Sequence, residues 1–177
     1  GTGDLAIALA RRIRDVQVMG VDLSEEMLAV ARRKVEARGL DSRIVLERGD
    51  AEHLEVADAS VDAATVAFGV RNFGDLAAGL RELARTIRPG GKVVILEFSR
   101  PRNRVFRALY EFYSYKILPR IGGLVSRDKR AYEYLPASVG EFPAPAEFLG
   151  MMEKAGFRNC RAKSQSCGIA QIYIGER

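Results

Sequence analysis

The sequence has few of the residues on which metal centres and redox proteins depend. Among its 177 residues are one histidine and two cysteines, Cys160 and Cys167. Neither cysteine has the spacing of a metal knuckle or a redox pair, and no His/Cys/Asp/Glu group in the sequence has metal-ligand spacing. We therefore expect no metal site and two reduced thiols, as is usual for a cytoplasmic protein.

Long apolar runs are also missing. The longest lies around residues 93–96, whereas a membrane span needs about 18 or more apolar residues. Such a short run suits a buried strand instead. Hydrophobic residues make up 47% and charged residues 29% of the chain, which predicts a globular protein. A length of 177 residues fits one domain, residues 1–177.

The net charge of +5 is concentrated in one segment. Residues 100–130 hold nine Lys or Arg against two acids, so this segment carries +7 and the rest of the chain −2. Aromatic residues alternate with the basic ones there. A nucleic-acid surface, a lid that touches anionic lipid and an ordinary solvated helical cap all fit this pattern.

Helical and extended patterns alternate along most of the chain. We expect helices over residues 4–13, 24–39, 75–88 and 145–156, and strands over 16–21, 43–47, 61–67, 92–98, 157–163 and 168–174. This order predicts an α/β protein with a parallel sheet and a final antiparallel strand pair. The alternation stops at Ser99, and residues 99–140 are expected to form a helical insertion.

The turn at residues 1–4, Gly-Thr-Gly-Asp, is a candidate cofactor site. Glycines let a ligand approach the backbone, and the helix that follows offers free N–H groups. Asp22 lies 19 residues after Gly3 and can accept hydrogen bonds from ribose hydroxyls. Both features also fit a site for a nicotinamide or flavin dinucleotide, and the glycine turn taken alone could be a tight turn that binds no ligand.

Two later segments narrow these alternatives. Asp50 can accept a hydrogen bond from an adenine amino group while the N–H of Ala51 meets a ring nitrogen, which favours S-adenosylmethionine. Arg71 and Asn72 follow the strand at 61–67, where α/β sheets bind their ligands. Flanked by aromatic residues, they suit an aromatic, oxygen-bearing substrate, although Arg71 could simply pair with a surface acid. We interpret His53, in a polar turn, as a bystander.

Several segments together resemble the class I methyltransferases and, more narrowly, the ubiquinone/menaquinone biosynthesis C-methyltransferases. They are residues 1–4, 22–28, 68–72, 88–91, 96–101, 113–122, 132–135 and 152–157. The resemblance implies a Rossmann-like, mostly parallel seven-stranded sheet of order 3-2-1-4-5-7-6, with an antiparallel seventh strand and helices on both faces. It also implies S-adenosylmethionine as cofactor and S-adenosylhomocysteine as its product.

The family's first strand precedes Gly1, so we expect this chain to be N-terminally truncated. That strand is central in the family's sheet, so its two neighbours should lack a partner. A polypeptide that begins at Gly1 is then expected not to bind the cofactor. Micromolar binding in calorimetry would contradict this expectation.

The resemblance and the patterns above give the following site residues. Cofactor binding is expected of Gly1, Thr2, Gly3, Asp22, Met27, Asp50, Ala51 and Ala67. Ala67 stands where many relatives have a serine, so its contact must use the backbone. Arg71 and Asn72 are the candidate catalytic pair, and Phe68, Tyr115 and Tyr134 are expected to bind the substrate. Gln171 and Ile172 stand where relatives often have Leu-His.

The implied reaction is C-methylation of a prenylated quinol, with 2-demethylmenaquinol as the first choice. A ubiquinone precursor, or another phenolic or lipid molecule, stays an alternative, as do a cofactor-binding non-catalytic subunit and a nicotinamide-dependent oxidoreductase. The family favours residues 99–140 as a substrate lid that touches anionic membrane, and disfavours nucleic acid. We expect a cytoplasmic protein, peripheral at the membrane, and leave a homodimer open.

Overall fold

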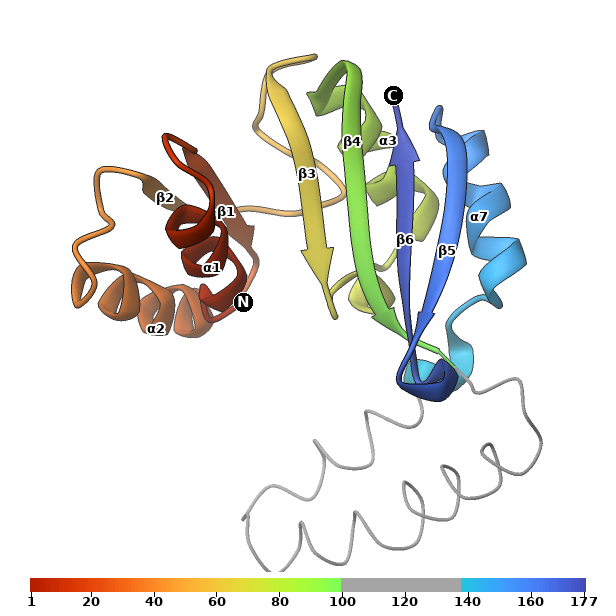
Figure 1. The fold of residues 1–177 in the computed structure, drawn as a ribbon, viewed down its shortest axis with the longest axis horizontal. Coiled ribbons are helices and arrows are strands. Elements are labelled where there is room, and N and C mark those ends of the chain that lie inside the picture. The colour runs from red at the N-terminus through yellow and green to blue at the C-terminus, as the bar shows by residue number, and fades with distance from the viewer. Residues whose placement is uncertain (100–137) are drawn as a thin grey trace, which may run out of the picture. The chain divides into compact units, whose positions relative to one another are not determined.

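The computed structural model describes residues 1–99 and 138–177 (Figure 1). The lid predicted at residues 99–140 therefore lies almost wholly outside the described residues, as do Tyr115 and Tyr134. The chain forms two compact units, residues 1–56 and 57–177.

The first unit contains two helices and two parallel strands: α1 (Asp4–Arg12), β1 (Val18–Asp22), α2 (Glu25–Glu36) and β2 (Ile44–Arg48). Its core joins α1 to the later elements through five buried residues, Ala6, Ile7, Ala10, Val35 and Ile44. The predicted start of α2 is confirmed, because the Ser24 hydroxyl accepts a hydrogen bond from the main-chain nitrogen of Met27 at 3.3 Å.

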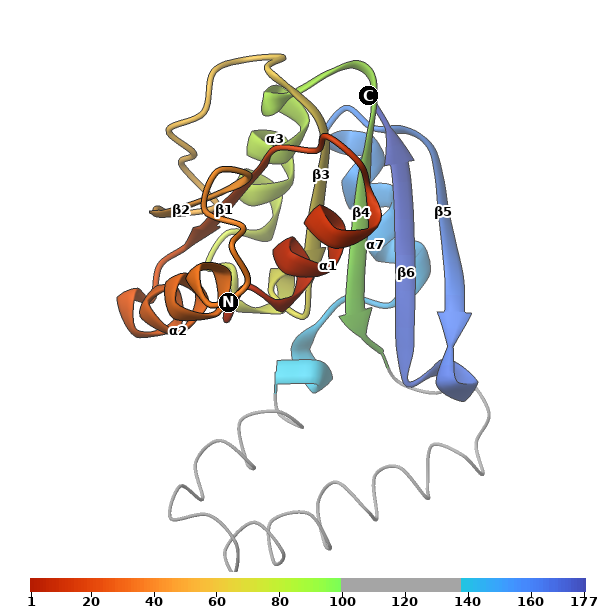
Figure 2. The ribbon, with the colours of Figure 1, turned by 60° about the vertical axis from the view of Figure 1, so that its left-hand side comes forward.

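The second unit contains a four-stranded sheet. Its elements are β3 (Val61–Ala67), η1 (Val70–Asn72), α3 (Leu76–Thr86), β4 (Ile87–Phe98), α7 (Pro145–Lys154), β5 (Arg158–Gln165), η3 (Ser166–Gly168) and β6 (Ala170–Glu176). The strand order is β3-β4-β6-β5, with β3 parallel to β4 and β6 antiparallel to both of its neighbours. Helices α3 and α7 contact each other and pack against the sheet (Figures 1 and 2).

Within each unit, the strand order agrees with the corresponding part of the implied order. The pair β1-β2 corresponds to strands 2 and 3, and β3-β4-β6-β5 corresponds to 4-5-7-6. Within the described residues, β1 and β3 each have one neighbouring strand. The predicted antiparallel pairing of the last two strands is confirmed.

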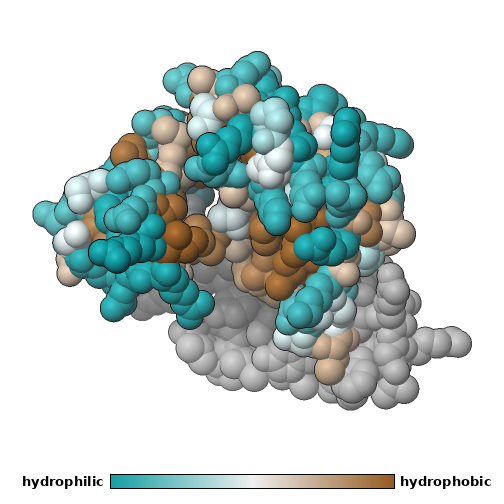
Figure 3. Space-filling view, turned by 45° about the horizontal axis from the view of Figure 1, so that its top comes forward, coloured by the Kyte–Doolittle hydropathy of each residue, from teal (hydrophilic) through white to brown (hydrophobic). Residues whose placement is uncertain are grey.

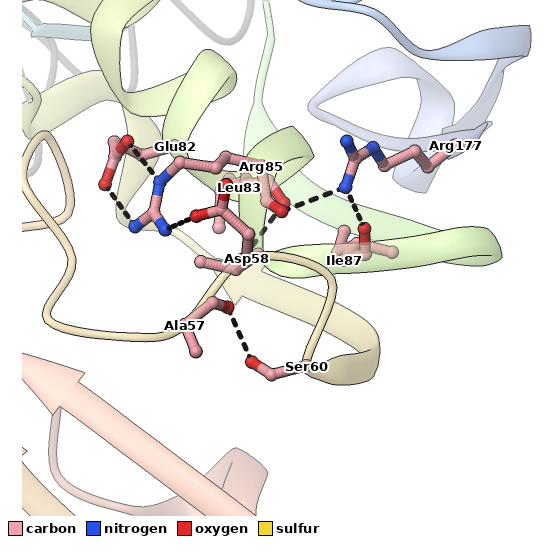
Figure 4. Close-up of polar contacts among 9 residues, drawn as sticks. Ala57, Asp58, Ser60, Glu82, Leu83, Arg85, Ile87 and Arg177 are labelled. Atoms are coloured by element: carbon pink, nitrogen blue, oxygen red, sulfur yellow. Dashed lines mark hydrogen bonds and ion pairs between the residues drawn. The ribbon is translucent and has the colours of Figure 1, made fainter.

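The boundary between α3 and β4 differs from the prediction. The helix was expected to reach Arg88, but it ends at Thr86, and β4 already begins at Ile87. Ile87 pairs with Val61, and the register shifts before Ala63. The Arg177 side chain donates to the carbonyl oxygens of Arg85, at 2.9 Å, and of Ile87 (Figure 4). These long-range hydrogen bonds hold residues 87 and 88 in an extended conformation, whereas the local sequence predicts that the helix continues through them.

The core of the second unit is aromatic and aliphatic. Phe148 of α7 is fully buried against Tyr173 of β6, with ring centroids 4.6 Å apart. Along β4, Val93, Ile95 and Glu97 are each 0% exposed, because alternate residues of a strand share one face. No helix within residues 1–99 and 138–177 has the length and apolarity to cross a membrane.

Candidate functional site

The turn before α1 allows a close approach to its backbone. Gly3 adopts φ +79°, and a Cβ placed there would lie 2.9 Å from the Ala31 Cβ in α2. The Gly3 carbonyl accepts the first helical bond, from Ile7 N at 2.9 Å. Within the described residues, no side chain caps this N-terminus. The first N–H groups of α1 are therefore directed toward a position that an acceptor on a ligand could take.

Asp22 ends β1 beside this turn. Its Oδ1 accepts a hydrogen bond from Ser24 N at 2.8 Å, and its Oδ2 accepts one from the nitrogen of Gly1. Its carbonyl accepts from Gly49 N at 3.2 Å, which brings in the segment after β2. The structure thus brings Gly1 to Asp22 and places Gly49, the neighbour of Asp50 in the sequence, beside the end of β1.

Asp50 shapes the turn after β2. Its Oδ1 accepts from Glu52 N at 2.9 Å, and its carbonyl accepts from His53 N at 3.1 Å. Ala51, the residue after Asp50, is half-buried, and the His53 side chain is exposed. Among residues 1–99 and 138–177, no group of His, Cys, Asp and Glu could hold a metal ion.

Two exposed apolar side chains, those of Leu23 and Met27, follow Asp22 closely in the sequence. Leu23 and Met27 are 61% and 46% exposed, and apolar surface is interspersed with hydrophilic surface in Figure 3. In α2 the side chains of Leu28, Ala31 and Val35 are buried, whereas Met27 lies on the exposed side of the helix. An exposed methionine near Asp22 suits a ligand that is apolar on one side and polar on the other.

The second unit carries the other predicted residues, just after β3. Ala67 ends this strand and is exposed, and Phe68 follows with φ 57°. That left-handed conformation is unfavourable for a bulky residue, and such strain is concentrated at functional sites. Phe68 is held by its N–H, which donates to Leu96 O at 2.8 Å, and by its ring, 4.4 Å from the Phe98 ring.

Arg71, in η1, is fixed from several sides. Its Nη1 donates to the Phe68 carbonyl and to Glu97 Oε1, both at 2.7 Å, and its guanidinium carbon lies 5.3 Å from the Phe98 ring centroid. The side chain is 11% exposed. The alternative that Arg71 pairs with a surface acid is wrong, because Glu97 is fully buried. Asn72, the next residue, is exposed.

Glu97 is the residue that sequence reasoning missed. The available signal was a lone acid in an otherwise apolar strand, Val93–Phe98, where burial without a partner would be costly. Its partner could not be read from the sequence, since 26 residues separate it from Arg71.

Comparisons with known proteins extend this description. The sequence profile of the ubiE/COQ5 methyltransferase family matches residues 1–177. A ubiquinone/menaquinone biosynthesis C-methyltransferase UbiE of Geobacter sulfurreducens is 46% identical over 178 residues, which cover 100% of this chain and 69% of that protein. A demethylmenaquinone methyltransferase of Thermus thermophilus is 46% identical over 177 residues, 100% of this chain and 79% of the relative.

A solved structure supports the fold alone. An S-adenosylmethionine-dependent methyltransferase from Aquifex aeolicus superposes with a TM-score of 0.71 at 18% identity, over 100% of this chain and 78% of that one. The predicted fold class, that of the class I methyltransferases, is confirmed.

Proposed function

Because the chain belongs to the ubiE/COQ5 methyltransferase family, we propose that it transfers a methyl group from S-adenosylmethionine to a ring carbon of a prenylated quinol. The first candidate substrate is 2-demethylmenaquinol. The name of the Thermus thermophilus relative supports this choice, and that of the Geobacter sulfurreducens relative also includes the ubiquinone pathway. A ubiquinone precursor is therefore the alternative substrate.

The residues of the first unit fit the cofactor. A carboxylate at Asp22 can accept from both ribose hydroxyls, and the turn at Gly1–Gly3 leaves room for the polar tail of the cofactor. Met27 offers an apolar contact, while Asp50 and Ala51 would recognise the adenine edge. When bound, S-adenosylmethionine supplies an electrophilic methyl group on its sulfonium. Contacts of Thr2 and Ala67 with the cofactor stay predictions.

The geometry around Arg71 carries the proposal for the reaction. An aromatic carbon becomes a good nucleophile when a neighbouring hydroxyl loses its proton, and a quinol has such a hydroxyl. A guanidinium keeps its charge in proteins and has no acceptor site, so Arg71 stabilises the phenolate while the hydroxyl proton passes to water. Once the methyl group has bonded to the ring carbon, that carbon loses its hydrogen to solvent as a proton and the ring becomes aromatic again. Asn72 orients the ring and Phe68 packs against it. Alignment of the ring carbon with the methyl donor then contributes much of the rate.

A variant of Arg71 tests this assignment in the full-length protein. Arg71→Ala should lower kcat by about 100-fold, as loss of an oxyanion stabiliser does, and leave the affinity for S-adenosylhomocysteine within about twofold. Arg71→Lys should recover part of the turnover, because the positive charge remains. An equal loss of turnover and cofactor affinity in Arg71→Ala would mean that Arg71 has only a structural role.

The oxidoreductase and binding-subunit alternatives make different predictions. S-adenosylhomocysteine should raise the melting temperature of the protein, whereas NADH should not, because a ligand stabilises only the fold that binds it. Methyl transfer to a short-chain demethylmenaquinol would dismiss a purely binding role. Protection by NADH alone would instead favour the oxidoreductase.

We place the enzyme in the cytoplasm, with peripheral contact to anionic membrane lipid. The support is the charge of residues 100–130 and a prenylated substrate that partitions into lipid. Flotation with liposomes should retain the protein only when anionic lipid is present, and less at high salt. Equal retention by neutral liposomes would contradict an electrostatic contact. A homodimer stays a prediction, and we expect no binding to nucleic acid.

A further inference from the structure

Glu97 is a fully buried acid that is paired with Arg71. It follows Val93 and Ile95 on the buried face of β4, and all three side chains are 0% exposed. Burying a carboxylate is costly unless it is paired. Replacing a buried ion pair by apolar residues is often neutral or stabilising. Stability alone therefore does not explain an acid at this position.

The hydrogen bonds of Glu97 converge on Arg71. Its Oε1 accepts from Arg71 Nη1 at 2.7 Å and from Phe98 N at 2.8 Å, and its Oε2 accepts from Arg71 N at 3.2 Å. One carboxylate thus binds both the main chain and the side chain of Arg71. Because Glu97 lies near the end of β4, it ties η1 to the rigid sheet.

The remaining contacts leave the guanidinium little freedom. Phe68 O accepts from the same Nη1, and the Phe98 ring lies beside the guanidinium. The Arg71 Nε is buried and has no hydrogen-bond partner in the described part of the chain. A buried donor without a partner is costly, so the surroundings must fix this arrangement.

We propose that Glu97 is a positioning residue that holds the Arg71 guanidinium in the orientation in which it stabilises the substrate phenolate. This inference rests on the proposed function of Arg71 and adds a second residue to it. Glu97 itself does not touch the substrate. A misplacement of about 1 Å in a catalytic group can cost about 100-fold in rate, so the loss of one fixed ion pair should be visible in kcat.

A double-mutant cycle in the full-length protein tests the proposal. Glu97→Gln keeps the size of the side chain and removes its charge. It should lower kcat by about 10- to 100-fold with KM and S-adenosylhomocysteine affinity within about twofold. In the Arg71→Ala background the same change should have no further effect, because the residue acts through Arg71. A wild-type kcat, or the same loss in both backgrounds, would overturn the proposal.

Glu82→Gln is the control for the loss of an ion pair away from Arg71. Glu82 pairs with Arg85 at 2.8 Å within α3, where both side chains are more exposed than those of Glu97 and Arg71. Arg85 also pairs with Asp58 in the loop before β3 (Figure 4). Arg71 follows that same strand, so the two ion pairs lie at opposite ends of β3. Glu82→Gln should keep kcat within about twofold. Should Glu97→Gln fail to fold, Glu97→Asp, which keeps the charge but shortens its reach, takes its place in the cycle.

An optical titration separates this proposal from the proposed function. In the presence of S-adenosylhomocysteine, 1-naphthol bound to the wild-type protein should ionise at lower pH than free 1-naphthol, as its absorbance reports. Arg71→Ala should abolish this shift and Glu97→Gln should reduce it. An unshifted wild type, or a full shift in Glu97→Gln, would overturn the proposal. If no quinol is methylated, the proposed function fails, whereas this titration still decides the role of Glu97.

Discussion

Gly3 and Ala31 lie so close that a β-carbon at residue 3 would stand 2.9 Å from the Ala31 Cβ. Gly3 also has a positive φ of 79°. The turn that opens α1 therefore needs glycine for two separate reasons, its backbone conformation and its contact with α2. This contact fixes where α1 begins relative to Asp22, and so where a cofactor could approach.

Gly3→Ala should therefore destabilise the protein and weaken cofactor binding. A non-glycine residue in the left-handed region costs about 1–2 kcal/mol, and the contact with Ala31 adds to this. Denaturant unfolding and calorimetry with S-adenosylhomocysteine measure the two effects. Gly39→Ala is the control, since Gly39 has φ +62° but open space around its Cβ position. Equal losses in the two variants would contradict a role for the contact.

Asp22→Asn should weaken cofactor binding without unfolding the protein. An asparagine Oδ1 can still accept from Ser24 N, so the local turn survives. The hydrogen bonds to the ribose lose their charged acceptor, which predicts a loss of about 10- to 100-fold in affinity for S-adenosylhomocysteine. Calorimetry measures the affinity, and Asp75→Asn serves as the control. Unchanged affinity in Asp22→Asn would remove Asp22 from the proposed site.

Asp75→Ala should lower stability but not activity. Asp75 caps α3, and its Oδ1 accepts from Ala78 N at 2.9 Å. Loss of such an N-cap costs about 1 kcal/mol. Urea unfolding of Asp75→Ala and Asp75→Asn checks the prediction, because asparagine keeps the cap. Similar destabilisation by both variants would show that the cap is not the cause.

The contribution of Asp4 should depend on pH. Hydrogen bonds from Lys34, at 2.8 Å, and from Thr2 hold the pKa of this carboxyl below its usual value. A depressed folded-state pKa stabilises the fold above the ordinary pKa of the acid, and this contribution is lost as the pH falls through the folded-state value. The difference in unfolding free energy between the wild type and Asp4→Asn should therefore stay constant near neutral pH and shrink only as the pH falls below the ordinary aspartate pKa of about 3.9. A difference that stays constant below that pKa would contradict this assignment.

Local sequence signals predicted much of the fold. The predicted helices at residues 24–39 and 75–88 begin at Ser24 and Asp75, and each of these side chains caps its helix within three residues. The predicted boundary between α3 and β4 was wrong because the hydrogen bonds that hold the start of β4 extended come from Arg177, the last residue of the sequence. Strand ends and turns can be read from neighbouring residues, whereas hydrogen bonds between distant segments cannot.

In the candidate site, too, local signals could be read and distant contacts could not. The glycines of the first turn, Asp22 and the Arg71–Asn72 pair could be recognised because they follow predicted strands or precede a predicted helix. Glu97 did not, since its role depends on a contact across 26 residues of sequence with Arg71. The unusual φ of Phe68 was equally hidden, because no local rule predicts a left-handed phenylalanine.

The most direct test of the account is to locate the transferred methyl group. The full-length protein is incubated with S-adenosylmethionine that carries a deuterated methyl group and with a short-chain demethylmenaquinol, kept either reduced or oxidised. Mass spectrometry and NMR of the product then assign the labelled atom. The account predicts label on a ring carbon of the quinol and none on the quinone. Label on an oxygen, or equal transfer to the quinone, would contradict C-methylation through a phenolate.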